Sequence, residues 1–336
     1  MNELIHTLCE AWGPSGHEGR VRQIIEGLVD DLVDEMRVDA LGNLVCRVAP
    51  APGVDPETAP RLMLAAHMDE IGVIVTHVDE AGYLRFAPVG GVIVGSLPGK
   101  RVTFEDGSVG VINVERREDA SRQPGLDHLY IDVGAADKSA VTQGVGDAAS
   151  FRQAVDWAGG RPIAANHDDR IGCVVLVETL RRLKRGPNAV YAVFTVQEEI
   201  GLRGATTSGY GVAPDAAIAI DVTGSGDTPK GMKMDVHLGK GPAIKVKDGG
   251  MIAHRGLRAL MEQRAEEAGI AFQLEVLTGG TTDAMAIQTS RAGVPAGCVS
   301  IPSRYVHSPS QLVDMQDVEG AVQLLCAVAE GSLADL

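Results

Sequence analysis

Aromatic residues, cysteines, basic side chains and long apolar runs are all scarce in this chain, and each shortage argues against a class of protein. Phe, Trp and Tyr make up 4% of the residues, which leaves little for stacking sugar rings and disfavours a glycoside hydrolase. Basic residues number 30 against 45 acidic ones, and the net charge of −15 argues against a nucleic-acid-binding surface, which needs clustered Lys and Arg. No apolar run approaches the length that spans a membrane.

The cysteines are odd in number and scattered, at Cys9, Cys46, Cys173, Cys298 and Cys326. Because most of them lie within apolar segments, we expect reduced, buried thiols, and neither a disulfide framework nor a zinc finger. The N-terminal segment NELIHTLCEAWG has helical spacing and acidic residues, and it lacks a basic stretch followed by an apolar core. We therefore expect no signal peptide and a cytoplasmic protein.

What is present is the composition of a folded protein. The 336 residues are 45% hydrophobic and 22% charged, enough for two domains or one large one. Helix-like and strand-like segments alternate in residues 1–70 and 160–336, whereas residues 71–159 form short β-rich runs between tight glycine turns. We therefore predict a discontinuous α/β domain, 1–70 and 160–336, with a small β-barrel or sandwich inserted at 71–159.

Hydrophobic periodicity and turn residues predict the main elements of the α/β part. The predicted helices are Glu3–Ala11, Glu18–Leu32, Asp169–Lys184, Arg255–Ala268 and Met315–Ala329. A strand pair is predicted within Asp34–Val48, a strand over Arg61–Ala66, and three more strands that lead to Glu198, Asp221 and His307.

Apolar strands in this sequence end repeatedly on residues that bind metals. The strand-end residues are His67, the pair Glu198 and Glu199, Asp221, and His307, and Asp168 stands where a helix should begin. The carboxyl ends of strands in an open sheet form the edge at which α/β proteins bind ligands. Two imidazoles and several carboxylates at one edge fit a two-metal hydrolase better than other common sites.

The first two motifs each have a functional and a structural interpretation. In His67-Met68-Asp69, residues two apart face the same side, so Asp69 can hold the second ring nitrogen of His67 while the first binds metal. The alternative is a strand-end histidine followed by an aspartate that starts a turn. Of Asp168 and Asp169, one is expected to cap the following helix, which leaves the other free to bridge two cations.

The remaining ligands are also ambiguous when taken singly. Glu198 and Glu199 would repel each other unless a cation lies between them. Because adjacent residues at the end of a strand point in different directions, one can bind metal while the other exchanges a proton with water. The alternative is a solvated corner between a strand and a helix. Asp221 ends a strand that looks buried on both faces and needs a cation or helix N–H groups as a partner. A histidine such as His307 is by itself more often structural.

Eight segments together resemble one known family nearly end to end. They are PSGHEG at 14–19, DALGN at 39–43, AAHMDEIG at 65–72, HDDRIG at 167–172, VQEEIGLRGA at 196–205, AIDVT at 219–223, GGTTDAMAI at 279–287 and YVHSPSQL at 305–312. With them the chain resembles the M42 family of metallo-aminopeptidases, which includes glutamyl, deblocking and TET-type aminopeptidases. The resemblance implies a mixed-sheet, three-layer α/β/α domain of the phosphorylase/hydrolase-like kind with an inserted all-β, barrel-like domain.

The resemblance also implies roles for individual residues. His67 and Asp221 would bind one metal, Glu199 and His307 the other, and Asp168 would bridge them. Glu198 would be the general base, and Asp69 would orient His67. The loop Gly279, Gly280, Thr281, Thr282 and Asp283 would bind substrate, although Thr281 stands where other members often have glycine.

The resulting expectation is an aminopeptidase that uses two divalent metal ions, zinc or alternatively cobalt or manganese, to release N-terminal residues from short peptides. The inserted domain would mediate dimer contacts in a homo-oligomer, with a tetrahedral dodecamer as the larger form. Two alternatives stay open: another two-metal amide hydrolase, such as a deacylase or a carboxypeptidase-like enzyme, and a non-enzymatic self-assembling scaffold.

The preferred N-terminal residue also stays open. A pocket for acidic side chains would use Arg255, Arg304 or Lys233, and an apolar pocket would use Met232, Met251 or Met285.

Overall fold

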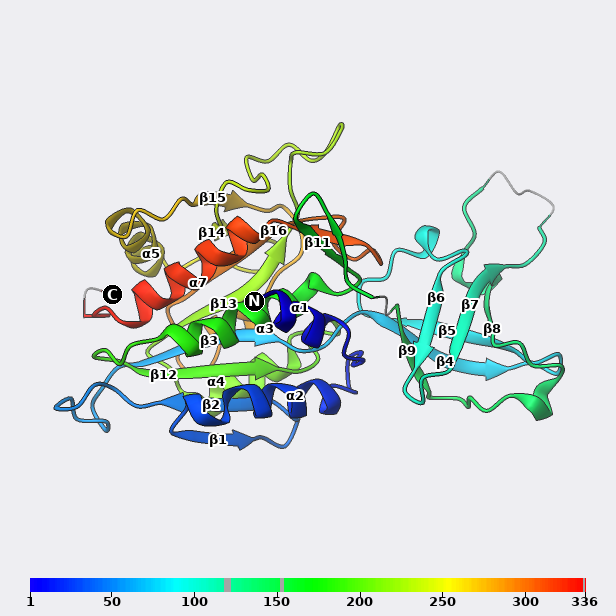
Figure 1. Cartoon of the computed structure of the whole chain (residues 1–336), viewed down its shortest axis with the longest axis horizontal. Helices are drawn as coiled ribbons and strands as arrows, with labels where there is room; N and C mark the ends of the chain where they lie inside the picture. The colour runs from blue at the N-terminus through cyan, green and yellow to red at the C-terminus, as the bar shows by residue number, and fades with distance from the viewer. Residues whose placement is uncertain (118–121, 152–153, 335) are drawn as a thin grey trace.

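The computed structural model describes all residues except 118–121, 152–153 and 335, so two short stretches of the predicted insertion lie outside the described residues. Figure 1 shows an α/β part that contains both chain ends and, beside it, a β-rich part formed by the strands between residues 72 and 150. Among the described residues, none of the helices combines the length and apolarity needed to cross a bilayer.

One large sheet organises the α/β part. Its described strands are β1 Glu35–Val38, β2 Leu44–Val48, β3 Arg61–His67, β10 Asp156–Ala158, β11 Arg161–Ala164, β12 Ala189–Thr195, β13 Ala216–Thr223, β14 Ala243–Lys247, β15 Gln273–Val276, β16 Ala296–Arg304 and β17 Gln311–Val313. They run in the order β1–β2–β12–β3–β13–β16–β17–β11–β10, with β14 attached to β16 and β15 to β14. The central strands β12, β3, β13 and β16 are parallel, whereas β1, β10 and β17 pair antiparallel. The sheet is therefore mixed, as predicted.

Helices cover both faces of this sheet. They are α1 Asn2–Cys9, α2 Gly19–Val29, α3 His167–Arg182, α4 Arg203–Val212, α5 Arg255–Glu267, α6 Asp283–Gln288 and α7 Met315–Ala329. Alternate residues of β3 enter different cores: Leu62 and Leu64 pack with α1, α2, α3, α5 and α7, whereas Met63 and Ala65 pack with α4 and α6. Because successive strand side chains point to opposite faces, the two cores lie on opposite sides of the sheet. The predicted three-layer α/β/α arrangement is confirmed.

The predicted helices are found with small shifts at their ends. The helix predicted over Glu18–Leu32 ends at Val29 and continues as a short 3-10 turn, Asp30–Leu32. Helix α6 begins at Asp283, inside the segment that the sequence analysis treats as a substrate-binding loop, and Thr282 caps it by accepting a hydrogen bond from the backbone N–H of Ala284.

The strands of the β-rich part form a closed barrel, and short 3-10 helices lie in its connections at Val94–Ser96, Leu126–His128 and Lys138–Ala140. Its strands are β4 Gly72–Val78, β5 Tyr83–Val89, β6 Arg101–Phe104, β7 Val109–Val114, β8 Leu129–Asp132 and β9 Ala148–Ser150, in the order β4–β5–β8–β7–β6–β9 with β9 returning to β4. Leu84, Val102, Ile112 and Ile131 fill its interior. The barrel strands lie within the predicted insertion 71–159. Strand β10, also within that segment, pairs with β11 of the large sheet.

Candidate metal centre

Neighbouring parallel strands bring the strand-end residues together. β3 lies between β12 and β13, and His67, the last residue of β3, is in register with Thr195 at the end of β12. Glu198 and Glu199 follow three and four residues later, and Asp221 lies near the end of β13. Because parallel strands end at the same edge, these side chains meet at the carboxyl edge of the sheet, as predicted.

Two groups of potential metal ligands form at this edge and share one residue. His67, Asp168 and Asp221 offer ligand atoms within 4.8 Å of one another, and so do Asp168, Glu199 and His307. The two oxygens of Asp168 face different histidines: Oδ1 lies 3.1 Å from His67 Nε2, and Oδ2 lies 3.3 Å from His307 Nε2. All five predicted ligands are thus brought together, with Asp168 at their centre.

Asp69 fixes both the ring of His67 and the loop of the two glutamates. Its Oδ1 lies 3.4 Å from His67 Nδ1, and its backbone oxygen lies 3.2 Å from the same nitrogen. Both groups are acceptors, so Nδ1 donates its proton to Asp69, and Nε2, which faces Asp168, would present its lone pair to a metal ion bound there. The carboxylate also accepts hydrogen bonds from the backbone N–H groups of Glu198, at 3.0 Å, and Glu199, at 3.2 Å.

The backbone N–H group of Gln197, which precedes the two glutamates, also has a buried acceptor. Gln197 donates to Glu18 Oε1 at 3.0 Å, and the side chain of Ser15 donates to Asp69 Oδ2 at 2.6 Å. Burial and the nearby charge of Asp69 raise the pKa of Glu18. Three consecutive N–H groups of the glutamate loop are therefore held by two buried carboxylates, a function of Glu18 that the sequence analysis missed although Glu18 lies in the PSGHEG segment.

The two adjacent aspartates divide their tasks. Asp169 Oδ1 accepts a hydrogen bond from the Gly172 N–H at 3.0 Å, which is the pattern of a helix cap, and its Oδ2 accepts one from the His67 backbone N–H at 3.2 Å. The side chain of Asp168 faces the two histidines. Its backbone N–H donates a hydrogen bond to Gln311 Oε1 at 2.7 Å, which holds the backbone of Asp168 in place. The peptide bond between the two aspartates is cis.

The electrostatics of this edge fit divalent cations. Burial and the charge of Asp168 raise the pKa of Asp221 to about 7 and that of Glu199 to about 8. Burial also raises the pKa of Glu198 well above its usual range, and the charge of Asp221 adds to the rise. Although burial opposes its charged form, hydrogen bonds from both histidines hold the pKa of Asp168 far below its usual value. Glu199 Oε1 is buried and has no hydrogen-bond partner among the described residues. A cation would satisfy this oxygen and remove the repulsion between the carboxylates.

The barrel contributes to the centre through two glycines after β5. A Cβ atom on Gly91 would lie 2.5 Å from the His307 ring, and one on Gly90 would lie 3.0 Å from the Cβ of Glu199. Gly90 also has a φ of +79°, which side chains other than glycine rarely adopt. The barrel backbone therefore packs directly against two of the predicted ligands. The Gly90-Gly91 pair is a signal of this contact in the sequence, and the sequence analysis did not use it.

A cavity of about 370 Å³ opens beside these residues. It is lined by Gly91, Asp168, Glu198, Glu199, Gly201, Leu202, Asp221, Val222, Thr223, Gly224, Lys245, Leu277, Gly280, Thr281, Thr282, Val306 and His307. Of the predicted substrate loop, Gly280, Thr281 and Thr282 reach it, whereas Gly279 and Asp283 do not. Asp283 is buried and accepts a hydrogen bond from the hydroxyl of Thr195.

The residues suggested for the specificity pocket lie elsewhere. None of Arg255, Arg304, Lys233, Met232, Met251 and Met285 is among the described residues that line the cavity. Arg304 is paired with Asp227 at 2.7 Å, and Met251 is buried in the core beside α4 and α6. The lining instead includes Lys245, which the sequence analysis did not single out, although it interrupts an apolar strand in AIKVK.

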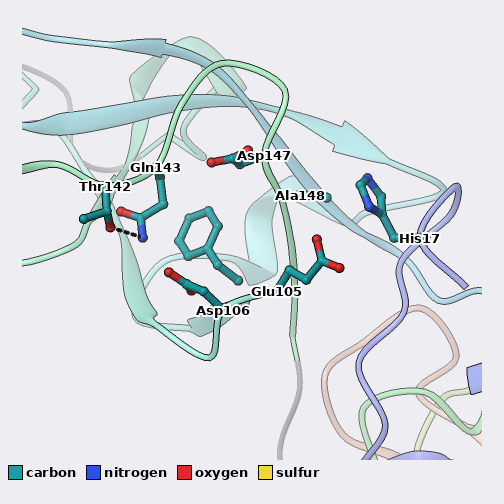
Figure 2. Close-up of a pocket in the computed structure, with 8 residues that line it drawn as sticks. His17, Glu105, Asp106, Thr142, Gln143, Asp147 and Ala148 are labelled. Atoms are coloured by element: carbon teal, nitrogen blue, oxygen red, sulfur yellow. Dashed lines mark hydrogen bonds between the residues drawn. The ribbon is translucent and has the colours of Figure 1, made fainter. Parts of the chain in front are cut away.

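A second cavity of about 370 Å³ lies between the barrel and the loop after α1 (Figure 2). Figure 2 shows Glu105, Asp106 and Asp147 around it, with His17 at one side. The carboxylate of Asp106 binds its own loop through Ser108. None of these side chains belongs to the groups of converging metal ligands found among the described residues. The candidate metal centre therefore lies at the cavity that contains Asp168.

Known proteins resemble the chain over nearly its whole length. The sequence profile described as M42 glutamyl aminopeptidase matches residues 43–324. A putative aminopeptidase of Acetivibrio thermocellus is 42% identical over 97% of this chain and 97% of that protein. The solved structure of aminopeptidase APDkam598 from the archaeon Desulfurococcus kamchatkensis has a TM-score of 0.93 and 41% identity, and the match covers 98% of this chain and 94% of that one.

A further structural relative is the TET1 peptidase of Pyrococcus horikoshii, described as assembling into a tetrahedron or a large octahedral shell. It has a TM-score of 0.88 and 32% identity over 98% of both chains. These matches contradict the non-enzymatic alternative, and the family implies divalent metal ions at a site such as the one above. On this evidence the chain belongs to the M42 family of aminopeptidases.

Proposed function

We propose that this chain is a dinuclear-metal aminopeptidase that removes N-terminal residues from short peptides. The observation that carries the proposal is the pair of ligand groups that share Asp168, one oxygen towards each histidine. A carboxylate with this arrangement suits two cations held about 3.5–4 Å apart, as in other two-metal hydrolases.

The ligand set divides evenly between the two proposed ions. His67 and Asp221 would hold one, Glu199 and His307 the other, and Asp168 both. Mixed imidazole and carboxylate ligands favour Zn²⁺, and they also accept Co²⁺ or Mn²⁺. When bound, such ions polarise a carbonyl group and lower the pKa of a water molecule.

Glu198 is the proposed proton carrier. It lines the cavity, its side chain is 11% exposed, and its Oε2 lies 4.0 Å from His67 Nε2. A carboxylate with a raised pKa suits proton transfer near neutral pH. Glu198 would accept a proton from the attacking water, and it would deliver that proton to the leaving amine as the C–N bond breaks. Asp69 acts as a positioning residue, because it fixes the tautomer of His67 and the backbone of Glu198.

The same carboxylates support a free N-terminal amine as the substrate group. Glu198, Glu199 and Asp221 place negative charge along one wall of the cavity, where an α-ammonium group can lie. An acetylated N-terminus would carry no charge to pair with this wall. This difference separates an aminopeptidase from a deacylase or a carboxypeptidase-like enzyme.

Assembly and location form part of the proposal. Val109 and Val111 on the barrel are 52% and 40% exposed, which supports the barrel as a contact surface between subunits. A dimer through the barrel, and a dodecamer built from such dimers, would parallel the shells described for the TET1 relative. The five free cysteines support a cytoplasmic location.

The test compares matched substrates that differ only at the N-terminus. The metal-loaded protein should hydrolyse a free aminoacyl anilide and leave its N-acetylated form intact, and a chelator should abolish the activity reversibly. Elemental analysis should find two divalent ions per chain. Equal cleavage of both substrates would support the deacylase alternative, and a protein active without any metal would contradict the proposal. Sedimentation distinguishes a dimer from a dodecamer.

A further inference from the structure

The cavity has a second wall that the proposed proton transfer does not use. We call the lining residues Asp168, Glu198, Glu199, Asp221 and His307 the ligand wall, and the lining residues Leu202, Val222, Thr223, Lys245 and Leu277 the specificity wall. With the scissile bond beside the ligand wall, the side chain of the N-terminal residue would extend onto the specificity wall. The chemistry of that wall then selects the substrate.

The specificity wall contains a lysine that already has a partner. Lys245 lies opposite Glu275 in the parallel pair β14–β15, and its Nζ is 3.0 Å from Glu275 Oε1. The hydroxyl of Thr223 donates to the same oxygen at 2.6 Å. The two charged side chains are 1% and 0% exposed. Separating so deeply buried an ion pair is costly, because each charge would be left without a partner.

The compensating charges lie behind the wall and not on it. Glu275 is absent from the cavity lining, and so is Asp248, whose Oδ2 lies 3.9 Å from the Lys245 Nζ. Asp248 is itself fixed by the backbone N–H groups of Gly250 and Met251. Although burial opposes its charge, Glu275 keeps the pKa of Lys245 above its usual value, so the ammonium group is charged at neutral pH. A side chain in the cavity therefore meets a cation that is present but already neutralised.

Each class of N-terminal side chain responds differently to this arrangement. An acidic side chain gains little from Lys245, because Glu275 already holds and neutralises the ammonium group. A basic side chain finds no carboxylate on the specificity wall, because Glu275 and Asp248 are absent from the cavity lining, so its charge would be buried there without a partner. A neutral apolar side chain buries its surface against Leu202 and Leu277 and disturbs no charge.

We propose that Glu275 masks Lys245, and that neutral apolar side chains such as leucine and methionine are therefore the preferred N-terminal residues. The inference rests on the proposed aminopeptidase function and names the substrate class of the same site. Glu275 is then a specificity-determining residue that acts through Lys245 without touching the substrate.

The test uses the full-length, metal-loaded protein with leucyl, glutamyl and lysyl anilides. We expect the wild type to show a kcat/KM for leucyl anilide that exceeds the other two by about tenfold or more, since tenfold corresponds to about 1.4 kcal/mol. In Glu275→Gln the lysine loses its neutralising charge. The ratio of glutamyl to leucyl kcat/KM should then rise by about tenfold, mainly through a lower KM for the glutamyl substrate.

Two further variants control this experiment. Glu80→Gln removes the carboxylate from an exposed Glu–Lys pair on the barrel, whose atoms are 2.8 Å apart, and it should leave the ratio unchanged. The double variant Glu275→Gln/Lys245→Met removes both charges of the buried pair, so it should keep the leucyl preference and gain nothing on glutamate. If Glu275→Gln does not fold, the test compares the substrate ratios of the double variant and the wild type. A gain of glutamyl turnover in the double variant would overturn the proposal.

The possible failures are distinguishable. A wild type that prefers glutamyl or lysyl anilide would refute the neutral pocket and leave the aminopeptidase function intact. An unchanged substrate ratio in folded Glu275→Gln would refute the masking by Glu275. If the metal-loaded protein cleaves none of the free-amine substrates, the proposed function itself fails, and the inference falls with it.

Discussion

On the ligand wall of the cavity, Asp221 and Glu199 are buried carboxyls whose pKa values rise to about 7 and about 8, whereas on the specificity wall Lys245 is held by Glu275 at 3.0 Å. The ligand wall places several carboxyl groups close together, and their ionised forms are disfavoured unless a cation is bound beside them. The second wall contains a charge that is neutralised within the protein. Both walls bury ionisable groups, so burial alone does not mark a binding site.

The difference lies in how completely the charges are satisfied. An oxygen such as Glu199 Oε1, buried without a hydrogen-bond partner among the described residues, is typical of a position that a ligand completes. The Lys245–Glu275 pair needs no ligand, because each charge is neutralised by the other. In the proposal, the positive charge of Lys245 is therefore not available to pair with a substrate. Four experiments test this contrast, in order of decreasing expected effect.

The largest effect is expected at Glu198. Glu198→Gln keeps the shape of the side chain and removes its ability to carry a proton, so kcat should fall on the order of 10²–10⁴-fold with little change in bound metal. Steady-state kinetics together with metal analysis of the same sample measure both quantities. Near-normal turnover at full metal occupancy would show that Glu198 is not the proton carrier, and Glu80→Gln serves as the surface control.

A loss of stability is expected on the specificity wall. Lys245→Met leaves Glu275 buried without its cation and should lower the free energy of unfolding by about 3–5 kcal/mol. The matched change Lys138→Met breaks an ion pair whose side chains are 49% and 89% exposed, and it should cost no more than about 1 kcal/mol. Denaturant unfolding of both variants gives the comparison. Equal losses would mean that the buried pair contributes no more than an exposed one.

The contact between the barrel and the ligand wall predicts a smaller change. In Gly91→Ala the new methyl group would lie 2.5 Å from the His307 ring, so the ring must move. We expect metal affinity to fall by about 10–100-fold, the range seen when the support of a ligand is removed. Competition with a chromogenic chelator measures the affinity. Gly144→Ala, also in the barrel and with open space around the new atom, is the control and should bind metal normally.

The smallest effect is a pH dependence of the metal-free protein. The folded state raises the pKa of Asp221 to about 7 and that of Glu199 to about 8, so it binds more protons than the unfolded chain between about pH 4 and pH 8. Stability should therefore decrease as pH rises through this range. Thermal melts at several pH values measure the trend, and Asp221→Asn should flatten it. A melting temperature that increased with pH would contradict this account of the ligand wall.

Much of the ligand wall was predictable from the sequence. The strand that ends at His67, the strand that carries Asp221 near its end and the strand before Glu198 are all continuous apolar runs. A polar residue at the end of such a run marks the carboxyl edge of a buried parallel sheet. The motifs around these residues also carried the family resemblance, which the comparisons confirm. The roles of the individual ligands and of Glu198 remain predictions.

The specificity wall was not predictable in the same way. Lys245 and Glu275 lie on two short strands that the sequence analysis did not identify, and only their register brings the charges together. Arg304, which looked available for an acidic substrate, is paired with Asp227, a residue far away in the sequence. The sequence shows that a lysine or an arginine carries a positive charge, but it does not show whether the folded chain pairs that charge with a carboxylate.

The sequence by itself determined the α/β class, the inserted β-rich segment and the candidate ligands, because hydrophobic periodicity and strand-end residues are local signals. Only the tertiary structure decided that Asp168 faces both histidines, that Gly91 of the barrel packs against His307, and that Glu275 neutralises Lys245. These are contacts between segments distant in the chain. Their energies depend on distances of a few ångströms and on the exclusion of water, and chain packing alone sets both.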